Sequence, residues 1–373
     1  MALVRVFGPQ TVIKVDTPAT PLFIIGTERS GSNLLRLILN AHSGITVPHP
    51  PHVLKFFAPL LPLYGDLKLP AARRRLAHDV LGLLEAHIHP WEITIAPERL
   101  MPTRLKPPED GLGPLVQMFF ALYDEYRRQS GKRRWGCKST FVIDYVEEVL
   151  AACPQAKFIL LVRDPRDVAV SSRRSIFNPF HPYFTARLWR RQQLTGLRWL
   201  DSEAGGQFHL LRYEDLIERP AETVASLCRF LGEEFEPQML EYHTTPEARK
   251  SQTLSASWRN LGLPIKRHNR NTFQTGLTAG ETQLVEAVGG ELLTRFGYPL
   301  KCPAAPPWPA SRPSALRVAW YHALDWAWRL AGEWRALLND RNYRLHWRRR
   351  LFLGRLRLRL KCQLDKAERA LTI

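Results

Sequence analysis

The sequence predicts an α/β fold, with an open, mostly parallel sheet that carries helices on both faces. Three buried apolar segments with strand character each lead within a few residues into a helical run. The expected pairs are strand 22–26 with helix 33–41, strand 157–162 with helix 167–175, and strand 207–212 with helix 220–231. Because the carboxyl ends of parallel strands meet at one edge of the sheet, we expect a ligand to bind across that edge.

The first of these units contains a glycine-rich turn of the phosphate-binding type. The apolar run from Pro21 leads into Gly26-Thr-Glu-Arg-Ser-Gly-Ser32, and a helical run follows from Asn33. Backbone amides at a helix N-terminus, together with the positive end of the helix dipole, bind a dianion. The turn therefore predicts a P-loop-like strand-loop-helix site made by Gly26, Thr27, Glu28, Arg29, Ser30, Gly31, Ser32 and Asn33.

The turn departs from that of a nucleoside triphosphatase, which has G-x-x-x-x-G-K-[ST] with a lysine on the terminal phosphates and a hydroxyl on magnesium. Gly26 and Gly31 keep the glycine spacing, but Ser32-Asn33 replace the Lys-Ser/Thr pair, and the cation is Arg29 inside the loop. A guanidinium can bind a phosphate or sulfonate in a planar, bidentate way. We expect chemistry that needs no metal. The alternative is an ordinary βα turn with a surface arginine.

A second anion site is expected where the strand 157–162 ends. Arg163 closes this strand, Pro165 suits the first turn of a helix, and Ser171 follows two helical turns later. Arg163 and Ser171 could therefore contact one phosphate at the edge of the sheet. Asp164 and Asp167 are expected to cap and orient the helix rather than to react, because acids in a first turn complement the dipole.

These motifs, in this order, resemble those of the sulfotransferases that use 3′-phosphoadenosine 5′-phosphosulfate (PAPS). In that family, the segment matching 26–32 binds the 5′-phosphosulfate, and the segment matching Arg163 to Ser171 binds the 3′-phosphate. The sequence from Arg29 to His42 resembles the bacterial, carbohydrate and tyrosylprotein branches of the family more than its small-phenol branch. The resemblance implies sulfonate transfer from PAPS to a hydroxyl, with an amine less favoured, of a carbohydrate, lipid or other small acceptor.

Two further segments resemble elements of the same family. Leu211-Arg-Tyr-Glu-Asp-Leu216 resembles its Y-E-D-L element, in which Glu214 and Asp215 are expected to cap the following helix. The segments 257–261 and 269–273 resemble a loop that covers the donor in bacterial members. That likeness implies donor contacts from Trp258, Arg259, Asn269, Arg270 and Asn271.

The candidate catalytic groups follow from the charge that builds on the bridging oxygen as adenosine bisphosphate leaves, by analogy with phosphoryl transfer. Arg29 and the loop amides are expected to stabilise this charge. Trp135-Gly-Cys-Lys-Ser-Thr140 resembles the family's W-x-x-K-[ST]-P element, which adds Lys138 as a candidate sulfonate or phosphate contact.

The general base does not follow from the resemblance alone. Many relatives have a pattern like V-P-P-E-S-H, whereas this chain has Val47-Pro-His-Pro-Pro-His-Val53. Pro50 therefore occupies the position of the glutamate. His49 and His52 are the candidates, since an imidazole can accept a proton near neutral pH. We favour His52, which occupies a histidine position of the pattern. The alternative is a rigid proline-rich loop whose histidines only pack or face solvent.

A proline-rich segment at 302–313 predicts a linker between a catalytic domain at 1–301 and a basic aromatic extension at 314–373. Residues 312–373 contain 15 Lys/Arg against 5 Asp/Glu, so this segment carries +10 of the net charge of +18 of the whole chain. The part 316–330 is expected to form an interfacial helix, whereas alternating Leu and Arg over 355–360 favour a strand. The extension could pack on the catalytic domain as a helical hairpin or dock on an anionic membrane. Nucleic acid is least favoured, because no reader motif is recognisable.

The composition is compatible with this interpretation and also indicates a cellular compartment. The 373 residues, 45% of them hydrophobic, are sufficient for one large core and an appendage. Five cysteines in no metal or disulfide pattern favour the reducing cytoplasm. If the basic extension docks on a membrane, we expect it at the inner face. The first nine residues are expected to form an edge strand rather than a signal peptide. The competing classes are a nucleotide or sugar kinase and a non-catalytic binding module with the nucleotide fold.

Overall fold

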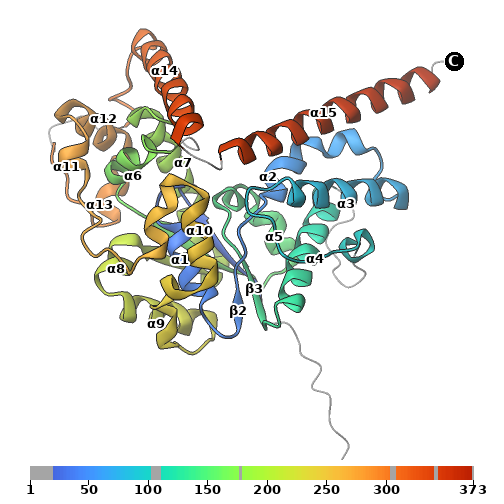
Figure 1. Cartoon of the computed structure of the whole chain (residues 1–373). Coiled ribbons are helices and arrows are strands. Elements are labelled where there is room, and N and C mark those ends of the chain that lie inside the picture. Colours follow the sequence, from blue (N-terminus) through green and yellow to red (C-terminus); the bar gives the residue numbers. More distant parts are fainter. Residues whose placement is uncertain (1–19, 102–110, 176–178, 303–307, 340–342, 372–373) are drawn as a thin grey trace, which may run out of the picture.

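The structure is a computed structural model that describes residues 20–101, 111–175, 179–302, 308–339 and 343–371. Its centre is a five-stranded sheet with the order β2-β3-β1-β4-β5. Figure 1 shows this sheet surrounded by helices. Every pairing in this sheet is parallel, which confirms the predicted fold class. The strands are β1 (Leu22–Gly26), β2 (Ile45–Thr46), β3 (Arg134–Cys137), β4 (Lys157–Val162) and β5 (Phe208–Arg212).

The three predicted strand-helix units are confirmed. β1 leads into α1 (Ser32–Asn40), β4 leads into α6 (Pro165–Ser172), and β5 leads through the short α8 (Tyr213–Glu218) into α9 (Pro220–Leu231). α6 ends three residues earlier than expected, since the expected helix ran to residue 175. β2 and β3 were not expected as strands, and they extend the sheet on the far side of β1.

Side chains of β1 alternate between the two faces of the sheet, as strand geometry requires. Phe23 and Ile25 belong to one apolar core, and Leu22 and Ile24 belong to another on the opposite face. The first core includes residues of α2 (Val53–Phe57), α3 (Pro70–Glu85), α4 (Gly113–Gln129), α5 (Val146–Ala152) and a C-terminal helix. The second includes residues of α1, α9 and α10 (Pro246–Leu254). Helices therefore cover both faces of the sheet. This leaves the ends of its strands as the edge that a ligand can reach.

The remaining elements surround this frame. α7 (Pro182–Leu200) packs on α6 and on α12 (Ala279–Gly289). Two short helices complete this side, α11 (Phe273–Gly276) and α13 (Glu291–Arg295). Short 3₁₀ helices are η1 (Ala58–Tyr64), η2 (Pro97–Leu100), η3 (Thr140–Tyr145), η4 (Glu203–Gln207), η5 (Pro237–Met239), η6 (Tyr242–Thr244) and η7 (Ala256–Gly262).

The C-terminal extension consists of two long helices, α14 (Ala315–Asn339) and α15 (Tyr343–Leu371). The strand expected over 355–360 is therefore wrong. Leu353, Leu356 and Leu360 are buried, whereas Leu358 is 68% exposed. Buried leucines three and four residues apart follow the helical period. The short alternation of Leu and Arg fitted a two-residue period only because the window was too small to show the longer one.

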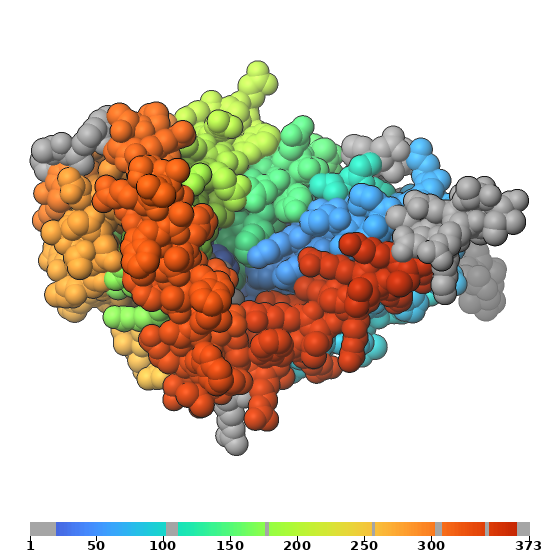
Figure 2. Space-filling model, turned by 90° about the horizontal axis from the view of Figure 1, so that it is seen from above, coloured from blue at the N-terminus to red at the C-terminus, as the bar shows by residue number. Residues whose placement is uncertain are grey.

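Both helices pack on the catalytic domain, as the helical-hairpin alternative expected. The Asp325 carboxylate of α14 accepts hydrogen bonds from the amides of Phe180 and His181, at 2.7 and 2.8 Å. In α15, Arg359 forms an ion pair with Asp79 of α3. Figure 2 shows both helices, in orange to red, along one face of the molecule. The edge strand expected in the first nine residues and the linker residues 303–307 lie outside the described residues, so the domain boundary stays a prediction.

Candidate active site

The loop after β1 depends on two glycines whose backbone no other residue could adopt without strain. Gly26 has φ 130°, and a Cβ there would lie 2.3 Å from the carbonyl oxygen of Leu161 in β4. Gly31 has φ 93°, and a Cβ there would lie 2.3 Å from the Tyr213 ring. A positive φ and a contact this close both exclude a side chain. The glycine spacing seen in the sequence thus reflects close packing between the loop, β4 and α8.

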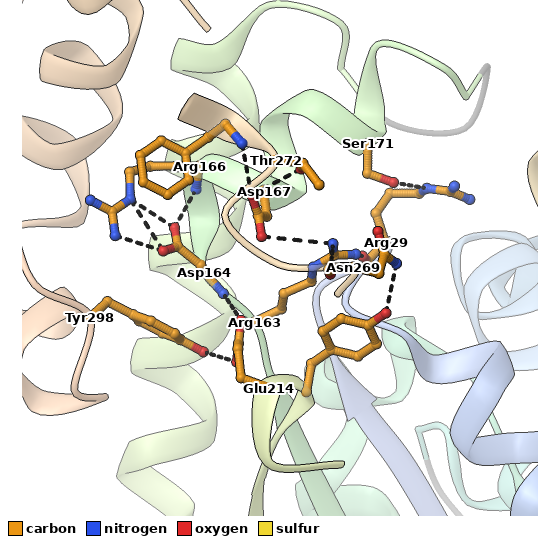
Figure 3. A network of polar contacts seen from close by, with 12 residues as sticks. Arg29, Arg163, Asp164, Arg166, Asp167, Ser171, Glu214, Asn269, Thr272 and Tyr298 are labelled. Carbon is orange, nitrogen blue, oxygen red and sulfur yellow. Dashed lines mark hydrogen bonds and ion pairs between the residues drawn. The ribbon is translucent and has the colours of Figure 1, made fainter. Parts of the chain in front are cut away.

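Arg29 joins this loop to the end of the next strand. Its Nε donates to Ser171 Oγ at 3.1 Å, and its carbonyl oxygen accepts from Arg163 Nη1 at 3.1 Å (Figure 3). Arg29 has φ 72°, a left-handed backbone that is uncommon outside glycine and is often found at functional sites. Burial, followed by the charge of Arg163, lowers the pKa of Arg29 to about 10. The guanidinium therefore stays charged at neutral pH.

Arg163 holds three segments together at the strand end. Besides its bond to Arg29, its Nη2 donates to the carbonyl oxygen of Asn269 at 3.1 Å. Its guanidinium lies 4.3 Å from the centre of the Tyr213 ring, and the Tyr213 hydroxyl accepts from Asn269 Nδ2 at 2.7 Å. The loop around Asn269, which was expected to cover the donor, is thus fixed directly to the predicted phosphate arginine.

The two acids of the second motif have different roles, and the predicted capping role is confirmed for Asp164 alone. Asp164 caps α6 by accepting from the Arg166 amide at 2.9 Å, and it also pairs with the Arg166 guanidinium. Asp167 accepts from Thr272 Oγ1 and from the Phe273 amide, both at 3.0 Å. Figure 3 shows these contacts around Arg163. They fix the strand end from two sides.

The expected capping role of Glu214 and Asp215 is wrong. No side chain caps the N-terminus of α8 or of α9. Glu214 instead accepts from the Asp164 amide at 3.1 Å and from the Tyr298 hydroxyl at 2.8 Å (Figure 3). Its partners come from distant parts of the chain, so it ties the start of α8 to the segment between β4 and α6 and to Tyr298.

A cavity of about 500 Å³ opens at these strand ends. Arg29 and Arg163 line the same cavity, which the two-site interpretation of the sequence requires. Its size falls within the range of small-molecule and cofactor sites. The predicted site residues that line it are Arg29, Gly31, Ser32, Asn33, Arg163, Ser171, Trp258, Arg259 and Asn269.

Other predicted donor-binding residues do not line this cavity. Gly26 and Thr27 lie buried at the strand end, and Ser30 is buried within the loop. Arg270 forms an ion pair with Glu218, and Asn271 has a left-handed backbone with φ 55°. Their roles in donor binding stay predictions.

A second, smaller cavity of about 100 Å³ adjoins the first. Arg29, Ser32, Asn33 and Trp258 line both cavities. The predicted catalytic residues Arg29, His49, His52 and Lys138 all line the second cavity, together with Glu28. The structure therefore brings the candidate base and the candidate charge-stabilising groups to one place, next to the larger cavity.

The two candidate histidines differ in access. His52 is half-buried, has φ 59°, and places Nδ1 2.8 Å from Ser139 Oγ, which leaves Nε2 for an acceptor. His49 is buried against Trp258 and His87, and neither of its ring nitrogens has a hydrogen-bond partner among the described residues. Burial, followed by the charge of Lys138, holds the pKa of both well below the ordinary value. Both rings are thus neutral at neutral pH, as a base must be.

Lys138 and Glu28 add opposite charges to the same cavity. Burial, followed by the charge of Arg36, lowers the pKa of Lys138 to about 8. Burial also raises the pKa of Glu28, which is the acidic residue in the described lining of this cavity. Glu28 was expected only as a donor-binding residue, so its place in the cavity that His52 lines was missed.

Sequence reasoning also missed lining residues that come from distant elements. Lys55 and Phe56 come from α2, Phe141 comes from η3, and His346 and Arg349 come from α15. No local motif marks them, because their role depends on how α2 and α15 fold over the strand ends. In the described ranges, no group of three or more His, Cys, Asp or Glu side chains is arranged to hold a metal ion.

A model of the sulfotransferase family matches residues 21–237. The chain is 25% identical over 311 residues to the nodulation protein NoeE of Sinorhizobium fredii, covering 76% of this chain and 67% of that protein. It is also 25% identical over 269 residues to an uncharacterized protein of Aquifex aeolicus, of which it covers 31%.

Solved structures that resemble the chain include the sulfotransferase domain of the Synechococcus PCC 7002 olefin synthase. That match has a TM-score of 0.49 and 21% identity, and it covers 72% of this chain and 94% of that one. Mouse sulfotransferase SULT7A1, complexed with PAP, has a TM-score of 0.41 and 14% identity, covering 83% of this chain and 91% of that one. Since the family model matches more than half of the sequence, the chain belongs to the sulfotransferase family.

Proposed function

We propose that this sulfotransferase transfers the sulfonate group of PAPS to a hydroxyl group of a carbohydrate, lipid or other small acceptor, with an amine as the less favoured acceptor group. The observation that carries the proposal is that Arg29 and Arg163 line one cavity while Arg29 also lines the smaller one. PAPS has an anionic group at each end of its ribose, so it needs two separate cationic contacts in a single cavity.

In this proposal, the larger cavity holds the donor. The loop amides at the start of α1 bind the 5′-phosphosulfate, because no side chain caps this helix and the amides of a first turn lack partners within a helix. Arg163 and Ser171 bind the 3′-phosphate. The Arg29 guanidinium uses its Nε on Ser171, so both of its Nη groups are available to the sulfonate end.

The smaller cavity receives the acceptor. The acceptor oxygen attacks sulfur, the bond from sulfur to the bridging oxygen breaks, and the acceptor proton passes to a base. Adenosine 3′,5′-bisphosphate leaves with the electron pair of that bond. Arg29 and Lys138 stabilise the charge on the leaving oxygen.

We favour His52 as the base, because it is half-buried whereas His49 is buried, and because its Nδ1 lies against Ser139 Oγ at 2.8 Å, which leaves Nε2 to take the proton. Glu28 is the second candidate. Its support is that it lines the same cavity and that burial raises its pKa, which makes it a stronger base than an exposed carboxylate.

Thermal stability tests the donor assignment. Adenosine 3′,5′-bisphosphate without magnesium should stabilise the chain, by about 2.7 kcal/mol at 100 times its dissociation constant. Stabilisation by Mg-ATP and not by the bisphosphate would contradict the proposal and favour a kinase. Bisphosphate binding with no turnover over a broad acceptor panel would instead favour a binding module.

We also propose that α14 rests on an anionic membrane surface. Trp320 and Trp334 are 62% and 64% exposed, and their helical spacing places them on one face with Leu316 and Leu338. A Trp/Leu face in a basic segment suits the interface of an anionic bilayer. No helix in the described part of the chain combines the length and apolarity needed to span a bilayer.

Vesicle binding tests this surface. The wild type should sediment with vesicles containing phosphatidylserine at low salt, and a variant with Trp320→Ser and Trp334→Ser should not. Substitutions are preferable to removal of the extension, because Leu353, Leu356 and Leu360 of α15 belong to the core. Equal recovery of both proteins, or equal binding to neutral phosphatidylcholine vesicles, would contradict this proposal.

A further inference from the structure

The smaller cavity contains more cationic side chains than sulfonate transfer requires. Arg29 and Lys138 are already assigned to the leaving oxygen. Lys55 of α2 and Arg349 of α15 line the same cavity and have no place in that step. Glu28 is the acidic residue in the described lining, so the cavity has an excess of positive charge.

Aromatic rings support these two additional cations. The Lys55 ammonium lies 3.3 Å from the centre of the Phe141 ring, and the Arg349 guanidinium lies 5.3 Å from the centre of the Phe56 ring. Such contacts stabilise a cation through the ring face without neutralising it. Glu28 is the carboxylate in the described lining that attracts both cations.

The surroundings weaken the charged forms of both side chains. Burial lowers the pKa of Lys55 and of Arg349, and Arg350 lowers that of Arg349 further. Glu28 attracts both side chains across the cavity and offsets only part of this effect. A partly buried cation whose charge is only partly balanced is unfavourable, and a bound anion would lower that cost.

We propose that Lys55 and Arg349 bind an oxyanion on the acceptor, so that the acceptor is an anionic molecule bearing a carboxylate, sulfate or phosphate group beside the hydroxyl that is sulfonated. This inference rests on the proposed function and names the acceptor class of the same site. A guanidinium matches two oxygens of such a group, and an ammonium adds a point charge. At about 100 Å³, the cavity admits the reacting end of an acceptor rather than a whole glycan.

The proposal gives the C-terminal extension a role in acceptor choice. Arg349 lies in α15, which is held on the catalytic domain by the Arg359–Asp79 ion pair and by buried leucines. In this proposal, the oxyanion of the acceptor contacts Arg349, which lies outside the region 21–237 that the family model matches.

Phosphate binding to the full chain saturated with adenosine 3′,5′-bisphosphate tests this site. Saturation fills the nucleotide part of the donor cavity but leaves the sulfonate position open, so inorganic phosphate is titrated calorimetrically at constant ionic strength into the wild type and into variants at Arg349. Arg349→Gln should weaken phosphate binding about tenfold, because a hydrogen-bonded charge is lost. Arg349→Lys should restore part of the affinity. Arg348→Gln is the matched control, since Arg348 is an exposed neighbour that does not line this cavity, and it should bind phosphate as the wild type does.

Absence of phosphate binding in the saturated wild type, or equal affinity in Arg349→Gln, would overturn the proposal and leave the proposed function intact. Failure to bind the bisphosphate in the first step would overturn both. In a second experiment, a small-molecule extract is separated into anionic and neutral fractions, and each fraction is incubated with the enzyme and labelled PAPS. Labelled product should come from the anionic fraction, with a KM about tenfold higher in Arg349→Gln. Product from the neutral fraction alone would contradict the inference.

Discussion

Arg29 Nε donates a hydrogen bond to Ser171 Oγ at 3.1 Å, joining the loop after β1 to the helix after β4. The two anion sites that the sequence suggested separately are therefore parts of one structure. The Arg29 carbonyl oxygen also accepts from Arg163, so the same residue is held at its backbone and its side chain. A guanidinium positioned in this way needs little reorganisation when charge develops in the transition state.

Arg29→Ala should lower kcat more than it lowers affinity for the bisphosphate. The contact strengthens as charge builds on the leaving oxygen, and losing one such donor typically lowers the rate by about 10² to 10³. Steady-state kinetics and calorimetry with adenosine 3′,5′-bisphosphate would measure the two effects separately. Retention of near-wild-type kcat would remove Arg29 from the reaction.

Gly26→Ala should destabilise the fold more than Gly65→Ala. Both glycines have positive φ, but a Cβ at Gly26 would lie 2.3 Å from the Leu161 carbonyl oxygen, whereas Gly65 has open space around it. Backbone strain alone costs about 1 kcal/mol, and the steric contact at Gly26 should add to it. Chemical denaturation would give both free energies of unfolding. Equal losses would mean that β4 does not constrain the loop as described.

His52→Ala should lower kcat by about 10² to 10⁴ if His52 accepts the acceptor proton. The acidic limb of the wild-type profile should lie well below pH 6.5, because the pKa of His52 is held below that ordinary value and activity is lost only on protonation. His49→Ala serves as the comparison. If His52→Ala retains activity and Glu28→Gln does not, the proton passes to Glu28 instead.

Lys138 predicts the alkaline limb of the rate profile. Its pKa is lowered to about 8, so the ammonium is present below this pH and its contribution is lost as pH rises through it. Lys138→Arg keeps the charge to higher pH and should move the alkaline limb upward. An unchanged alkaline limb in Lys138→Arg, measured as kcat/KM against pH, would assign that titration to another group.

The sequence was sufficient where the site depends on neighbouring residues. The strands before Gly26 and Arg163, the turn glycines and the cap at Asp164 are local features, and each is found where it was expected. Contacts between distant residues were not predictable. Glu214 binds Tyr298 instead of capping a helix, because its partner is 84 residues away.

The acceptor side of the site escaped prediction for a related reason. Arg349 enters the cavity because α15 packs against α3, and Leu-Arg alternation over 355–360 had suggested a strand there. A six-residue window cannot separate a period of two from one of 3.6 when every second residue is leucine. Glu28 and His52 likewise line one cavity only because α2 packs near the loop after β1.

The central claim is that one adenosine donor spans Arg29 and Arg163, and the affinities of Arg163→Ala for two nucleotides test it most directly. The wild type should prefer adenosine 3′,5′-bisphosphate over adenosine 5′-phosphate by about tenfold or more, the effect of one charge-assisted contact. Arg163→Ala should abolish this preference while keeping much of its affinity for adenosine 5′-phosphate. A wild type with no preference, or a variant whose preference is unchanged, would contradict the account.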